Sequence, residues 1–227
     1  MHRFACVIAL GLFATWGTSA RAGFFRFDTD PFAGTNVLTT PGRQFVQNEL
    51  FIPNFSITDD RFSFDPTVFG VSTQVSFFNG FAANVPTGGL NVIVLQDSDP
   101  DNDPSTPFNA GVAADLIAAR VDQAGPGFFV YFNTALNVTR LVYSTDLSDN
   151  QADLKILARL TNPVGQAAIA ALPTFTAGNF DISTVPEPPS ALLAVLGSIG
   201  LLVMARRRHR QSKAPAATTP PSSTTSN

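Results

Sequence analysis

Residues 128–160, FFVYFNTALNVTRLVYSTDLSDNQADLKILARL, decide the fold. This segment contains three apolar stretches that are rich in β-branched and aromatic side chains. The stretches are residues 128–133, 140–144 and 154–160, and turn residues separate them at Asn137 and at 148–150. Short apolar runs bounded by turn residues are typical of β-strands. The segment therefore predicts three consecutive strands.

Earlier residues show the same strand character. Apolar and polar side chains alternate with a period of two in residues 43–51, 60–65 and 72–78. This alternation is typical of strands with one buried face. Residues 91–96 form a short, continuous apolar run, which predicts a buried central strand.

Two segments favour helices. Asn109 can cap a helix over residues 110–121, and the Gly-Pro-Gly sequence at 125–127 supplies a stop. A second short helix is expected over residues 165–172. The predicted fold class is mainly β with one or two short helices, arranged as an antiparallel, two-sheet, sandwich-like domain over residues 23–184.

The composition of residues 23–184 restricts the chemistry of this domain. These residues contain no Cys, His, Trp or Met, so thiol and imidazole catalysis, disulfides and the usual zinc, copper, haem and iron–sulfur ligand sets are excluded. Fifteen Asp and one Glu stand against six Arg and one Lys, a net charge of −9. Nucleic acid is therefore not an expected partner, because phosphate binding needs clustered basic residues.

An acidic loop follows the apolar run at 91–96. Its carboxylates are Asp97, Asp99, Asp101 and Asp103. Alternate oxygen ligands are what an EF-hand loop offers calcium, but Asn102 stands where Gly is needed and Phe108 where the bidentate Glu should be. Two interpretations stay open: an irregular calcium site completed by Asp115 or a backbone carbonyl, and a solvated loop whose Asp and Pro residues make turns.

A carboxylate-based hydrolase is the minor alternative. Its acid and base would come from Glu49, Asp59, Asp60, Asp65 and the acidic loop. Carbohydrate binding is a further alternative, in which paired phenylalanines such as residues 77–78 would stack on sugars. Those pairs fit a hydrophobic core better, because stacking sites favour Trp and Tyr.

The first 22 residues have the pattern of a signal peptide. Arg3 gives a positive start, residues 4–16 are apolar, and Ala20 and Ala22 form a cleavage site before Gly23. We therefore expect cleavage after Ala22 and export of the domain.

The C-terminus carries a second targeting segment at 185–210. A proline-bounded peptide, Val185, Pro186, Glu187 and Pro188, precedes an uncharged apolar run, and the basic cluster Arg206, Arg207 and Arg208 follows it. The run at 191–205 would reach only about 22 Å as a helix. Flanking arginines can make up the difference to a membrane span, so we expect a transmembrane helix at about 190–205. The basic cluster then stays cytoplasmic.

This three-part segment resembles the sorting signal of PEP-CTERM proteins. The resemblance implies export in a Gram-negative bacterium, recognition of residues 185–188 by an exosortase, and passage from the inner membrane to the cell surface or the exopolysaccharide matrix. Residues 211–227 depart from the usual tail, which ends close after its arginines, and their composition predicts disorder. The expected function is that of a structural, non-enzymatic surface protein associated with exopolysaccharide or biofilm.

Overall fold

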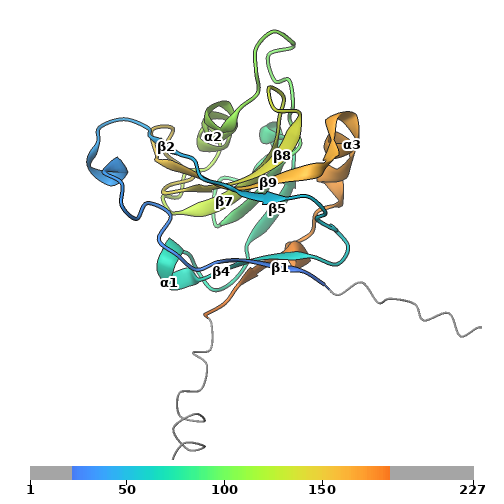
Figure 1. Ribbon diagram of the computed structural model, residues 1–227. Coiled ribbons are helices and arrows are strands. Elements are labelled where there is room, and N and C mark those ends of the chain that lie inside the picture. The colour runs from blue at the N-terminus through green and yellow to red at the C-terminus, as the bar shows by residue number, and fades with distance from the viewer. Residues whose placement is uncertain (1–21, 185–227) are drawn as a thin grey trace, which may run out of the picture. The chain divides into compact units, whose positions relative to one another are not determined.

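The computed structural model describes residues 22–184, which fold as two sheets and a few short helices (Figure 1). The large sheet has the order β2 (Phe45–Val46), β9 (Leu154–Val164), β8 (Val138–Ser144), β7 (Gly127–Asn133), β6 (Val92–Leu95) and β5 (Phe77–Gly80), and β3 (Leu50–Ile52) also pairs with β9. The small sheet consists of β1 (Phe24–Phe27), β4 (Arg61–Phe64) and β10 (Phe180–Ile182). The expectation of a mainly β domain with few helices is confirmed.

The helices are short and sit at the ends and outer face of the sheets (Figure 1). They are α1 (Pro66–Phe69), α2 (Ala110–Ala118) and α3 (Gly165–Ala171), with 3-10 turns η1 (Val37–Thr39), η2 (Ala82–Asn84), η3 (Leu172–Thr174) and η4 (Ala177–Asn179). The Asn109 carboxamide caps α2 by accepting hydrogen bonds from the N–H groups of Gly111 (2.9 Å) and Val112 (3.2 Å). Both predicted helices are therefore present, each ending earlier than expected.

The predicted antiparallel arrangement is wrong for most of the domain. Among the described residues, β8 alone runs against its neighbours, β7 and β9, and every other pairing in both sheets is parallel. The physical reason is visible between β6 and β7. These two strands are joined through α2, and a connection of this kind returns the chain to the same end of the sheet, so that the strands lie parallel.

Two of the predicted strands differ from the observed ones more than the others do. The segment at 43–51 is interrupted at Asn48, whose φ of 91° ends β2 and separates it from β3. Only the end of the segment at 72–78 is strand, because β5 begins at Phe77. Before it, Asn91 holds the chain in a loop: its carboxamide accepts from the Ser76 N–H and donates to the Gln74 carbonyl, both at 2.8 Å.

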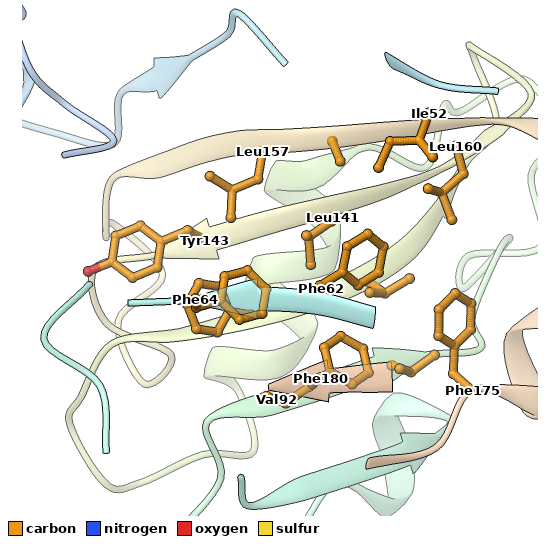
Figure 2. Close-up of a cluster of buried hydrophobic side chains, with 14 of the residues drawn as sticks. Ile52, Phe62, Phe64, Val92, Leu141, Tyr143, Leu157, Leu160, Phe175 and Phe180 are labelled. Carbon is orange, nitrogen blue, oxygen red and sulfur yellow. The ribbon is translucent and has the colours of Figure 1, made fainter. Parts of the chain in front are cut away.

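The main core lies between the two sheets and consists largely of phenylalanine (Figure 2). Phe62 and Phe64 of β4 point from the small sheet toward Leu141 and Leu157 of the large sheet. The Phe64 ring stacks on that of Phe128, with ring centroids 3.8 Å apart. Close ring contacts of this kind add to the free energy gained by burying apolar area.

A second core lies on the opposite face of the large sheet, beneath α2. It joins Ile93 and Leu95 of β6 with Phe129 of β7 and with Ala113 and Ile117 of α2. Because successive side chains of a strand point to opposite faces, β6 supplies both cores, which explains its uninterrupted run of apolar residues.

A β-bulge in β9 controls which side chains reach each core. Leu141 pairs with Ala158, but the next residue of β8, Val142, pairs with Ile156, so Leu157 is an extra residue. Leu157 and Ala158 consequently both join the core between the sheets. Beyond the bulge the alternation is reversed, and Arg159 points away from that core.

Candidate functional site

The predicted targeting residues lie mostly outside the described part of the chain. Ala20, Val185, Pro186, Glu187, Pro188, Arg206, Arg207 and Arg208 are all outside residues 22–184. Within residues 22–184, the structure has no helix long and apolar enough to cross a membrane. The expected transmembrane helix at about 190–205 is not among these residues and stays a prediction.

Gly23, which follows the predicted cleavage site, is bound to a buried carboxylate. Its N–H donates to Asp60 Oδ1 at 2.6 Å, and the Ser56 N–H donates to Asp60 Oδ2 at 2.8 Å. Asp60 is only 7% exposed. A Cβ atom on Gly23 would lie 2.9 Å from Asp60 Oδ1, closer than real Cβ contacts allow. The position therefore favours glycine.

The acidic loop begins where β6 ends, and its carboxylates are engaged mainly in local contacts. Asp97 accepts a hydrogen bond from the Ala82 N–H at 2.7 Å, which fixes η2. Asp101 accepts from the Asp103 N–H (3.1 Å), and Asp103 accepts from the N–H of Ser105 (2.9 Å). These are turn contacts of the kind that the second interpretation of this loop expects.

Within this loop, the Asp99 carboxyl has a raised pKa. Partial desolvation, followed by the neighbouring Asp101, raises the pKa of the Asp99 carboxyl. Within the described residues, no three His, Cys, Asp or Glu side chains are grouped so that they could hold a metal ion. Calcium binding at Asp97, Asp99, Asp101 and Asp103 stays a prediction. A melting experiment with EGTA and then with calcium tests it, because calcium bound by the folded state must raise the transition temperature.

Two of the carboxylates named for a hydrolase, Asp59 and Asp65, accept hydrogen bonds within their own turns. The hydroxyl groups of Ser56 and Thr58 lower the pKa of Asp59. Asp65 caps α1, and hydrogen bonds from the Thr67 hydroxyl and N–H lower its pKa. A general acid active near neutral pH needs a raised pKa instead.

Glu49 lies in a buried ionic cluster with Arg140 and Arg159. Arg140 Nε donates to Glu49 Oε2 at 2.9 Å, and terminal nitrogens of both arginines also contact the carboxylate. The side chains of Glu49 and Arg140 are 6% and 8% exposed. The Arg159 guanidinium lies 4.9 Å from the centre of the Phe51 ring, an attractive cation–π contact. Sequence reasoning missed this cluster, which joins β3, β8 and β9 with the loop that carries Glu49.

A polar cleft of about 420 Å³ lies beside the chain segments that lead into β5, β6 and β7. Its lining, drawn from residues 22–184, contains amides, hydroxyls, glycines and small apolar groups, and no charged side chain. The side-chain polar groups are those of Ser72, Gln74, Ser76, Asn91 and Gln123. Neutral hydrogen-bonding groups without charge suit a neutral, hydroxyl-rich ligand.

Hydrogen bonds fix the walls of this polar cleft. The buried Asn91 carboxamide joins two of the three segments through its contacts with Ser76 and Gln74. Gln123 Oε1 accepts from the Gly89 N–H at 2.9 Å and so ties in the third. No single sequence motif marks this cleft, because its lining comes from three separate loops.

Comparisons of the chain with protein-family models, curated proteins and solved structures give no match.

Proposed function

We propose that this chain is an exported, non-enzymatic surface or matrix protein that is first held in the inner membrane and then processed by an exosortase-type enzyme. The sequence motifs at the two ends are the basis for this proposal. The folded domain acts as the passenger, and the predicted sorting segment at 185–210 delivers it to the cell surface or to exopolysaccharide.

The contact between Gly23 and Asp60 is the structural observation that carries the proposal. Cleavage after Ala22 would turn the Gly23 nitrogen into an α-ammonium group at the position where Asp60 already accepts a hydrogen bond. A buried carboxylate is then neutralised by the new chain end, which a continuing peptide cannot do. Folding and signal cleavage at this bond therefore favour one another.

The strands fit the same boundaries. β1 begins at Phe24, directly after the predicted cleavage site, and β10 ends at Ile182, just before the predicted recognition element at 185–188. Cutting the chain at either boundary would remove no strand of the described fold. This arrangement supports removal of both terminal segments from a domain that stays folded.

Expression in a Gram-negative host that has an exosortase, and in a derivative lacking it, tests the proposal. N-terminal sequencing should give Gly23, and mass spectrometry should find a cut near residues 185–188 only when the exosortase is present. Glu187→Ala should leave the chain in the inner membrane, and Asp115→Asn, at a carboxylate that is 55% exposed, serves as a control outside the signal. A full-length chain in the inner membrane of both hosts would refute sorting and leave a simple anchor.

The polar cleft favours a second function, binding of a neutral carbohydrate. The supporting observation is its uncharged lining of amide and hydroxyl groups in a domain with a strongly negative charge. A glycan screen with the purified chain tests this function. Gln74→Ala should weaken binding of any neutral glycan that is found, whereas Gln151→Ala, on an exposed turn, should not. If Gln74→Ala binds the glycan as tightly as the original chain does, this cleft is not the site.

A further inference from the structure

A second cleft opens between the two sheets at the edge where β1 and β2 lie. It has a volume of about 470 Å³ and is closed on one side by the loop at 29–35. Its apolar surface includes Phe27, Val46, Phe69 and Leu157. Phe69 and Leu157 belong to the main core, so the cleft leads from the surface to the side chains that pack between the sheets.

The balance of acidic and basic side chains in this inter-sheet cleft differs from that of the domain as a whole. Residues 23–184 hold sixteen acidic and seven basic side chains, yet the cleft is lined by two basic ones, Arg26 and Lys155, and by one acidic one, Asp30. The Asp30 carboxylate accepts the Phe32 N–H at 2.9 Å. Basic side chains therefore outnumber acidic ones in the lining of the inter-sheet cleft, beside an apolar surface.

Lys155 is the better-placed cation. Its ammonium group donates one hydrogen bond, to the Gln47 carbonyl at 2.9 Å, which fixes the side chain in the cleft and leaves two N–H donors for a ligand. Arg26 is tied to Asp28, with Nε 3.0 Å from Oδ2, and both side chains are substantially exposed. We therefore expect Lys155 to make the main ionic contact and Arg26 to assist.

We propose that the inter-sheet cleft binds a small organic monocarboxylate with an apolar body. The carboxylate lies at Lys155 and Arg26, and the apolar part packs on Phe69 and Leu157. Lys155 makes no ion pair within residues 22–184, so its ammonium group can take one carboxylate. The volume lies in the range of small-molecule sites. This site is separate from the polar cleft and does not depend on the proposed route of export.

The ionisation of Lys155 agrees with this geometry. Burial lowers the pKa of the Lys155 amino group, and the opposing effect of Glu49 is smaller. A bound carboxylate would stabilise the ammonium form and raise this pKa. Proton binding by Lys155 therefore reports occupancy of the inter-sheet cleft.

The full chain suits a direct experiment, because Lys155 and Lys213 are its only lysines. Expression with ¹³C-labelled lysine leaves both ammonium groups unmodified and gives each lysine its own NMR signal, and Lys155→Arg assigns the signal of Lys155. We expect 4-phenylbutyrate to shift the Lys155 signal saturably and to raise its pKa. The Lys213 signal, within the same molecule, is the control and should not move.

Matched ligands and variants separate this site from general adsorption. 4-Phenylbutan-1-ol, which has the same apolar body without the charge, should bind less tightly. Arg26→Gln should weaken phenylbutyrate binding roughly two- to fivefold, the range of a partly exposed ion pair. Arg61→Gln, on the neighbouring strand β4, should leave it unchanged. An unmoved Lys155 signal at about 10 mM ligand, or an equal response to the alcohol, would overturn the proposal.

Discussion

At the scale of single residues, Glu49 supplies the negative charge that compensates two buried or partly buried arginines. Arg140 and Arg159 both contact its carboxylate, and the Nε of Arg159 is buried without a hydrogen-bond partner. Two positive charges around one negative charge leave the cluster with a single net charge. Removal of the carboxylate charge would leave both guanidinium groups without any compensation in a site with little access to water.

Glu49→Gln should therefore lower the free energy of unfolding by about 3 to 5 kcal/mol, the usual cost of breaking a buried ion pair. Urea denaturation measures the change. Asp115→Asn is the matched control, because Asp115 pairs with Arg43 but its side chain is 55% exposed. That variant should lose no more than about 1 kcal/mol. Equal losses in the two variants would contradict the importance of burial at Glu49.

Tyr143 gives the domain a sensitivity to alkaline pH. Its hydroxyl donates to the Phe69 carbonyl at 2.8 Å, and burial, with a smaller effect of Asp30, raises its pKa to about 12. Since an unfolded tyrosine ionises near pH 10, the stabilisation is complete below that pH and is lost as the pH rises toward 12.

Tyr143→Phe should be about 1 kcal/mol less stable than the original chain at neutral pH, because the Phe69 carbonyl loses its donor. The difference should disappear between pH 10 and pH 12, since only the original chain loses stability through Tyr143 there. Unfolding curves at a series of pH values provide the measurement. A constant difference in stability across this pH range would mean that ionisation of Tyr143 is not linked to unfolding.

Residue-scale prediction from the sequence succeeded where the cause was local. Asn109 was identified as a cap because a cap needs only its own side chain and the next N–H groups. The role of Glu49 was not found, because its partners are distant in the sequence, at 140 and 159, and meet only in the folded sheet.

At the scale of elements, α2 depends on its cap. Asn109→Ala should lower the free energy of unfolding by about 1 kcal/mol, because the N–H groups of Gly111 and Val112 lose their acceptor. Asn109→Asp keeps the acceptor and should retain most of the stability. Chemical denaturation of the two variants distinguishes loss of the acceptor from a general intolerance of substitution at this position.

The direction of β6 and β7 could have been inferred from their sequence. A strand at 91–96, a helix beginning at Ala110 and a strand beginning near Phe128 form a strand–helix–strand series, which indicates a parallel pair. The turn residues around Asn137 and Ser148 correctly mark the antiparallel connections of β8. The parallel pairs in the small sheet could not be inferred, because β1 and β10 come from opposite ends of the domain.

The bulge in β9 shows a limit of periodicity. Regular alternation through residues 154–160 would place Arg159 on the same face as Leu157, in the core between the sheets. The extra residue at Leu157 turns Arg159 to the other face, where Glu49 and Phe51 meet it. An unbroken apolar pattern gives no sign of such an insertion, because Leu157 and Ala158 are both apolar.

At the scale of the whole molecule, removal of the signal peptide should stabilise the fold. The free energy of unfolding should be about 1 kcal/mol larger for a chain that starts at Gly23 than for one that starts at Met1. The reason is that a charged donor strengthens the hydrogen bond to Asp60. The gain should fade as the pH rises past the α-amino pKa, ordinarily about 7.7 to 8.0.

Thermal melting of the two chains in the same detergent measures this difference, which corresponds to a shift of roughly 2 to 4 °C. A chain that starts at Ala22 is the matched control, since its ammonium group lies one residue away from Asp60. Asp60→Asn should abolish the difference. An equal gain for the Ala22 chain would mean that the benefit comes only from removing the preceding residues.

The two clefts could not be predicted from the sequence. The polar cleft draws on three loops, and the inter-sheet cleft joins β1, β2 and β9 through Arg26, Val46 and Lys155. A site of this kind depends on the distance between two sheets, which no local pattern records. The acidic loop, by contrast, is continuous in sequence and was easily recognised as a candidate.

The parallel placement of β1 and β10 on either side of β4 has a mechanical consequence for a protein held by its ends. Phe24 of β1 lies opposite Arg61 at one end of β4, whereas Ile182 of β10 lies opposite Phe64 at the other end. Tension between the chain ends therefore pulls along these strands and loads all their hydrogen bonds together, rather than peeling them one by one. Force spectroscopy with handles at residues 23 and 184 should show a higher rupture force than with handles at 23 and 72. The small sheet would then be the part of the described fold that resists tension between the chain ends.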